Sequence, residues 1–130
     1  LRAMHVNVSA PFALTQACMP LLLGAPDSAV VFVLDNPDLL QRAHWGAYGA
    51  SKAALERLVA ILHQETDDGA MRTHALLPAP MRTTLRRMAY FGEDSMQLPL
   101  PDATAEAAVY LLGPDAAPAR GAVLDLRDGT

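Results

Sequence analysis

The sequence predicts an α/β fold with a parallel sheet, because short, mainly apolar runs alternate with longer amphipathic segments. Each apolar run is bounded by polar, proline or glycine residues, a pattern typical of short buried strands. Strands that are separated by helices connect through right-handed crossovers and pair in parallel. The expected strands are residues 29–34, 73–77 and 122–126, and the expected helices are residues 2–23, 45–66 and 102–112.

The composition of the chain argues against several classes of protein. Its 130 residues have the length of one domain, and 52% hydrophobic with 18% charged residues is typical of a globular chain. A formal net charge of -4 argues against nucleic acid or an anionic membrane as a partner. Cys18 is the only cysteine, which fits a reducing cytoplasm. No apolar run is long enough to span a bilayer, and the four histidines show no metal-ligand spacing, so neither a membrane nor a metal is expected.

The first half of the chain predicts one helix and one strand. Apolar side chains recur at spacings of three and four over residues 2–23, and Gly24 can end this helix. Pro11 has no N–H for the carbonyl of Asn7, which therefore needs another partner such as an ordered water. The alternative is a kink without a chemical role. Residues 29–34 predict a strand that is buried on both faces.

The second half predicts two helices, two strands and a flap. Residues 45–66 form a long amphipathic pattern, and residues 73–77 predict a second buried strand that Pro78 ends. Residues 79–100 mix methionine and aromatic side chains with arginines and prolines, which indicates an irregular flap. Asp102 can cap the last helix. A last strand gives a parallel sheet of only three strands, which is an incomplete fold.

Tyr48 and Lys52 are the residues most indicative of chemistry. They lie four residues apart in a predicted helix, and therefore on the same helix face. A positive charge beside a phenol lowers its pKa below the ordinary value of about 10, so that Tyr48 can exchange a proton near neutral pH. The alternative for this pair is a solvated helix surface.

Four motifs then follow one another in a recurring order. They are residues 4–7, the Tyr48/Lys52 pair, residues 78–83 and residues 120–125. With these motifs the chain resembles the carboxyl-terminal half of a short-chain dehydrogenase/reductase. The resemblance implies that residues 1–130 are the catalytic and substrate-binding part of a single doubly wound, Rossmann-like domain. It also implies hydride transfer between NAD or NADP and a small carbonyl or alcohol substrate.

The resemblance implies a role for each matching residue. Tyr48 would be the general acid/base, and Lys52 would lower its pKa and hold the nicotinamide ribose. Asn7 would hold a water in a proton relay to Lys52. The residues implied along the cofactor, besides Tyr48 and Lys52, are Pro78, Ala79, Met81 and Thr83. The flap would give the substrate an apolar wall, formed by Met81, Met88, Tyr90, Phe91 and Met96. The alternative is that these side chains simply cover the sheet.

The sequence departs from the family pattern at two positions and lacks one motif. Asp35 stands thirteen residues before Tyr48, where the family has a serine that binds the substrate carbonyl. An ionised aspartate only accepts hydrogen bonds and repels a developing alkoxide, so it replaces serine only when protonated. Otherwise a group such as Asn36 takes that role. Ala79 stands where the family has glycine, and the glycine-rich loop for the pyrophosphate is absent from these residues.

These departures support an alternative function, a non-catalytic oligomerisation or binding module of the same family. Under either function, helices 2–23 and 45–66 are expected to pair with a second copy in a homo-oligomer. Small residues permit that close approach: Gly49, Ala50, Ala53, Ala54 and Ala60. The chain starts at Leu1, and its natural amino terminus is expected to lie further upstream.

Overall fold

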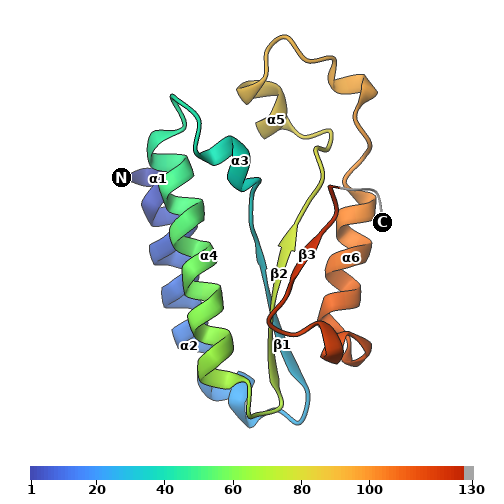
Figure 1. Ribbon diagram of the computed structural model, residues 1–130. Coiled ribbons are helices and arrows are strands. Elements are labelled where there is room, and N and C mark those ends of the chain that lie inside the picture. The colour runs from blue at the N-terminus through green and yellow to red at the C-terminus, as the bar shows by residue number, and fades with distance from the viewer. Residues whose placement is uncertain (128–130) are drawn as a thin grey trace.

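The computed structural model describes residues 1–127, which form three parallel strands with helices on both sides (Figure 1). The strands are β1 (Ser28–Val33), β2 (Met71–Leu77) and β3 (Val123–Asp125), and β2 lies between the other two. The expected α/β fold with an incomplete, three-stranded parallel sheet is confirmed.

The helices fall into two groups in Figure 1. The first helical segment runs through α1 (Arg2–Met4), a π-helical turn η1 (His5–Ser9) and α2 (Ala10–Gly24). It lies beside α4 (Gly46–Thr66) on one side of the sheet, and α6 (Asp102–Leu112) covers the other side. The predicted bounds of the last helix are confirmed at both ends, although Asp102 is its first residue and not its cap.

The π-helical turn surrounds Asn7. In this turn the N–H of Ala10 donates to the carbonyl of His5, five residues earlier. Pro11 follows directly, and it has no N–H to offer to the carbonyl of Asn7. Single π turns often lie at functional sites. An irregularity was therefore predicted at this place, but its π-helical form was not.

Two segments outside the predicted helices and strands contain short helices. The loop before α4 holds α3 (Pro37–Leu40), which begins because the side chain of Asn36 accepts the N–H two residues later. The predicted flap over residues 79–100 holds α5 (Thr84–Ala89), where the side chain of Thr83 accepts the N–H three residues later. The remaining short turns are 3-10 helices, η2 (Ser95–Gln97) and η3 (Pro114–Ala119).

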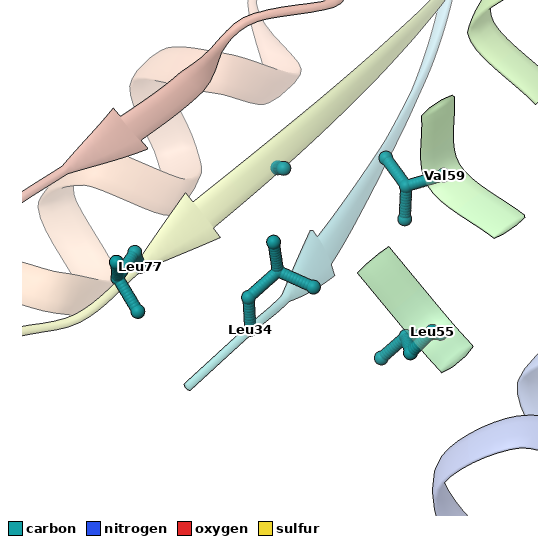
Figure 2. Close-up of a cluster of buried hydrophobic side chains, with 5 residues drawn as sticks. Leu34, Leu55, Val59 and Leu77 are labelled. Atoms are coloured by element: carbon teal, nitrogen blue, oxygen red, sulfur yellow. The ribbon is translucent and has the colours of Figure 1, made fainter. Parts of the chain in front are cut away.

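The hydrophobic core lies on both faces of β2, and all seven residues of that strand are buried. Figure 2 shows the cluster between the sheet and α4, where Leu34 and Leu77 lie near Leu55 and Val59. The opposite face is packed by a second cluster, Leu76, Leu111 and Ala116. The predicted burial of the second strand is confirmed, although the strand begins at Met71 and not at residue 73.

The prediction that the first strand is buried on both faces is wrong in the described residues. Most side chains of β1 are only half-buried, and that of Val33 is 45% exposed. The physical reason is that β1 forms an edge of the described sheet, where β2 is its one partner.

The helix Arg2–Gly24 also carries exposed apolar side chains, among them Leu14 and Leu21. Its 23 residues include a window of mean hydropathy 1.4, which is long and apolar enough to cross a membrane by length and composition alone. The sequence prediction considered only uninterrupted apolar runs, and these are shorter than this helix. Core helices and signal sequences meet the same criterion, so the helix does not by itself indicate a membrane protein.

Candidate active site

A cavity of about 370 Å³ lies where β1 and β2 end, at the carboxyl edge of the sheet. Ligands of open parallel sheets bind at this edge. Seven of the eight residues that the sequence predicted for the site line this cavity: Asp35, Tyr48, Lys52, Pro78, Ala79, Met81 and Thr83. The eighth, Asn7, does not.

Tyr48 and Asp35 contact each other directly inside the cavity. Tyr48 lies in the first turn of α4, and Asp35 follows the end of β1. The phenol Oη donates to Asp35 Oδ2 at 2.7 Å, and Asp35 Oδ1 accepts the backbone N–H of Asn36, also at 2.7 Å. Each carboxylate oxygen therefore accepts one hydrogen bond, and the phenol proton is directed at Asp35.

This contact reverses the expected effect on the pKa of Tyr48. Partial burial of the phenol raises its pKa above the ordinary value, and the hydrogen bond and charge of Asp35 raise it further. Lys52 was expected to lower the pKa, but its Nζ donates to the carbonyl of Val33 at 3.1 Å. Burial lowers the pKa of Lys52 itself, while the charge of Asp35 opposes that shift. The expectation of a tyrosinate that Lys52 favours is therefore wrong for this structure.

Asn7 acts on the cavity from outside it, through a residue that the sequence analysis missed. Its Nδ2 donates to Ser51 Oγ at 3.0 Å, and Ser51 Oγ donates to the carbonyl of Tyr48 at 2.7 Å. Ser51 is completely buried. The signal that could have identified it is a polar residue between Tyr48 and Lys52 in a helix rich in alanine, since such a side chain needs a partner. The predicted water relay through Asn7 stays a prediction.

Only part of the predicted apolar wall lines the cavity. Met81 and Tyr90 contribute to it, whereas Met88, Phe91 and Met96 are 67%, 92% and 68% exposed. The prediction is therefore wrong for these three residues. They lie in or after α5, whose exposed side the sequence pattern did not reveal.

Aromatic contacts hold α5 against the cavity. The ring centroids of Trp45 and Tyr48 are 5.7 Å apart, and those of Trp45 and Tyr90 are 6.1 Å apart. The guanidinium of Arg86 lies 4.1 Å from the Tyr90 ring centroid and binds Glu93 through two hydrogen bonds of 2.8 Å. These contacts connect the segment after β2 with the first turn of α4.

Arg127 is a second residue that the sequence analysis missed. It lines the cavity, and its Nη1 donates to Asn36 Oδ1 at 2.8 Å. Its Nη2 also binds Asp125 Oδ2 at 2.6 Å. Its place just after β3 could have identified it, because the carboxyl ends of parallel strands meet at one edge.

The Asp125–Arg127 pair predicts a specific dependence of stability on pH. Side-chain and backbone hydrogen bonds from Arg127 lower the pKa of Asp125 to about 2. A depressed folded-state pKa stabilises the fold above the ordinary value of about 3.9, and this stabilisation is lost as pH falls from about 4 to 2. In Asp125→Asn, the melting temperature of the full-length protein should therefore fall less steeply over that range. The control is Asp68→Asn, in an exposed turn, and an unchanged slope in Asp125→Asn would contradict the prediction.

Comparisons with known proteins agree with the resemblance found in the sequence. Residues 1–92 match the sequence profile of the family described as short chain dehydrogenase. The uncharacterized oxidoreductase YciK of Escherichia coli K12 is 36% identical over 126 residues, which cover 97% of this chain and 50% of YciK.

Solved structures agree over nearly the whole chain. A short chain dehydrogenase from Salmonella enterica serovar Typhi CT18 superimposes with a TM-score of 0.88 at 35% identity, covering 94% of this chain and 50% of that protein. A short chain dehydrogenase from E. coli CFT073, complexed with NADPH, gives a TM-score of 0.86 at 36% identity and the same coverage. The chain thus spans about half the length of these relatives, and it belongs to the short-chain dehydrogenase family.

Proposed function

We propose that this chain is the catalytic and substrate-binding half of an NAD(P)-dependent oxidoreductase that interconverts a small carbonyl compound and its alcohol. Tyr48 is the proposed general acid/base, and Lys52 and Asn7 support it. The observation that carries this proposal is that one cavity brings Tyr48, Lys52 and Asp35 together with Pro78, Ala79, Pro80, Met81 and Thr83.

The lining of the cavity fits the nicotinamide end of a dinucleotide. Its volume lies within the range of small-molecule sites. The Lys52 ammonium supplies donors for ribose hydroxyls, and Thr83 keeps its O–H free to donate, since its oxygen accepts the N–H of Arg86. When bound, the nicotinamide supplies or takes up the hydride. The NADPH bound to the E. coli CFT073 relative favours NADP(H) over NAD(H) in this proposal.

The chain's own residues have two tasks in the proposed reaction. Tyr48 gives a proton to the substrate oxygen during reduction, or takes one during oxidation while its own hydroxyl proton passes to Asp35. Lys52 balances the negative charge that then collects on Tyr48 and Asp35, because it lines the same cavity and interacts electrostatically with Asp35. Ser51 and Asn7 fix the first turn of α4, and with it the position of the phenol.

The rival function is a non-catalytic binding module, and the bond between Tyr48 and Asp35 favours it because that bond engages the phenol proton. The test uses the full-length protein. Binding of NADH and NADPH is measured by fluorescence titration, and turnover is screened by cofactor absorbance with aldehydes, ketones and alcohols. Turnover supports the oxidoreductase function, and cofactor binding without any turnover supports the non-catalytic binding module. Failure to bind either dinucleotide overturns the oxidoreductase function.

We also propose that α2 and α4 pair with a second copy of the protein. Both helices expose apolar side chains, including Leu14, Leu21 and Ile61. One residue assigned to this contact needs correction, because Gly49 is buried against α3 of its own chain. Of the other small residues, Ala50, Ala53 and Ala60 are exposed and Ala54 is half-buried.

A further inference from the structure

The hydrogen bonds of Asp35 and Tyr48 determine what these two groups can offer to a substrate. The one hydroxyl proton of Tyr48 is directed at Asp35 Oδ2, so the free capacity of the phenol oxygen is that of an acceptor. An ionised Asp35 also only accepts, and its Oδ1 already holds the N–H of Asn36. The two groups therefore present acceptors to the cavity.

Two cations near this pair, Lys52 and Arg86, donate hydrogen bonds to groups other than Asp35. Lys52, from α4, directs its ammonium to the carbonyl of Val33, and Arg86, from α5, binds Glu93. Arg127, after β3, binds Asp125 and Asn36. The ring of Tyr90 also acts on the phenol electrostatically. The carboxylate of Asp35 therefore keeps lone pairs for a donor on a ligand.

We infer that the preferred substrate of this site is an alcohol and not a ketone, with Asp35 accepting the alcohol O–H; this rests on the proposed function. An alcohol can donate to Asp35 without disturbing the bond from Tyr48. A ketone oxygen only accepts, so it must draw the phenol proton away from a charge-assisted bond of 2.7 Å. Apolar side chains that line the cavity, such as Leu39, Leu85 and Ala89, suit an alcohol with an apolar body.

The reaction on such a substrate balances with an oxidised nicotinamide dinucleotide as the oxidant. The carbinol C–H bond breaks, and its hydrogen leaves with both electrons to the nicotinamide ring. The O–H proton passes to the Asp35–Tyr48 pair and then to solvent. The products are a ketone, the reduced dinucleotide and one proton.

The test compares one alcohol with the ketone of the same skeleton. Cyclohexanol and cyclohexanone are titrated into the full-length protein without cofactor, so that neither reacts, and each Kd is measured by ligand-observed NMR. We expect wild type to bind the alcohol about tenfold more tightly, which corresponds to about 1.4 kcal/mol. This preference should disappear in Asp35→Ser and Asp35→Asn.

The matched control is Asp38→Ser, which removes another carboxylate three residues away whose side chain is 80% exposed. Its alcohol preference should equal that of wild type. The inference is overturned if wild type binds cyclohexanone as tightly as cyclohexanol or more tightly. It is also overturned if both Asp35 variants keep the preference for cyclohexanol, or if wild type binds neither compound. If both variants fail to fold, the wild-type ratio alone decides. Tyr48-dependent turnover together with any of these outcomes leaves the proposed function intact and removes the alcohol preference.

Discussion

Replacing Tyr48 by phenylalanine is expected to lower kcat/KM of the full-length protein by about 10²–10⁴-fold, the usual contribution of a general acid or base. The phenol oxygen is the atom of Tyr48 that reaches Asp35, and it lines the cavity with Lys52. Phenylalanine keeps the ring and its contact with Trp45 but removes the proton donor. The measurement is cofactor-linked turnover of the best substrate found in the screen, in both directions.

The control for this prediction is Tyr110→Phe. Tyr110 lies on α6, on the side of the sheet opposite α4, and does not line the cavity. Its substitution should leave kcat/KM within about twofold, as surface changes remote from a site usually do. Loss of the bond to Asp35 also costs Tyr48→Phe on the order of 1 kcal/mol of stability. A Tyr48→Phe protein that folds, binds cofactor and retains wild-type turnover would remove Tyr48 from the mechanism.

The pattern of hydrophobic residues predicted the larger helices and strands well. Burial of one face determines both the spacing of those residues and the helix or strand that they form. Residues 75–77 form a short apolar run before Pro78, and β2 is buried throughout, its polar residues Thr73 and His74 included. The ends of α6 follow from its first acidic residue and from Gly113 beyond it. The short helix α3 escaped prediction because one turn of helix has no periodicity, and a proline at its start is equally typical of a loop.

The sequence predicted which residues line the candidate site, but not how their charges and hydrogen bonds act on one another. Spacing along the helix placed Tyr48 and Lys52 on one face, and both line the cavity. The spacing could not show that the Lys52 ammonium would donate to the carbonyl of Val33, because this bond depends on where the end of β1 lies relative to α4. Likewise, the separation of thirteen positions between Asp35 and Tyr48 gave no distance between their side chains. The pKa of Tyr48 is raised by burial of the phenol first and by the nearby Asp35 second, and tertiary structure determines both.

Gly49→Ala is expected to destabilise the full-length protein by about 3 kcal/mol, the upper part of the range for inserting a methyl group into a close-packed site. Alanine normally stabilises a helix interior relative to glycine, by about 1 kcal/mol. At Gly49, however, an added Cβ would lie 2.4 Å from the carbonyl oxygen of Leu40 and 3.3 Å from its carbon. These are backbone atoms of α3, so relief requires the whole helix α3 to move. Denaturant unfolding measures the change in stability.

The displacement of α3 should also reach the site, because α3 begins directly after Asp35 and Asn36. We therefore expect Gly49→Ala to lose turnover together with stability, even at temperatures where the protein stays folded. Gly24→Ala is the matched control, since Gly24 is the last residue of α2 and an added Cβ there meets nothing within 4 Å. Its stability should stay within about 1 kcal/mol of wild type, with any change favourable. A Gly49→Ala protein as stable as the Gly24→Ala protein would show that the close approach of α3 and α4 does not constrain the fold. Wild-type turnover in Gly49→Ala would show that this approach does not position Asp35 against Tyr48.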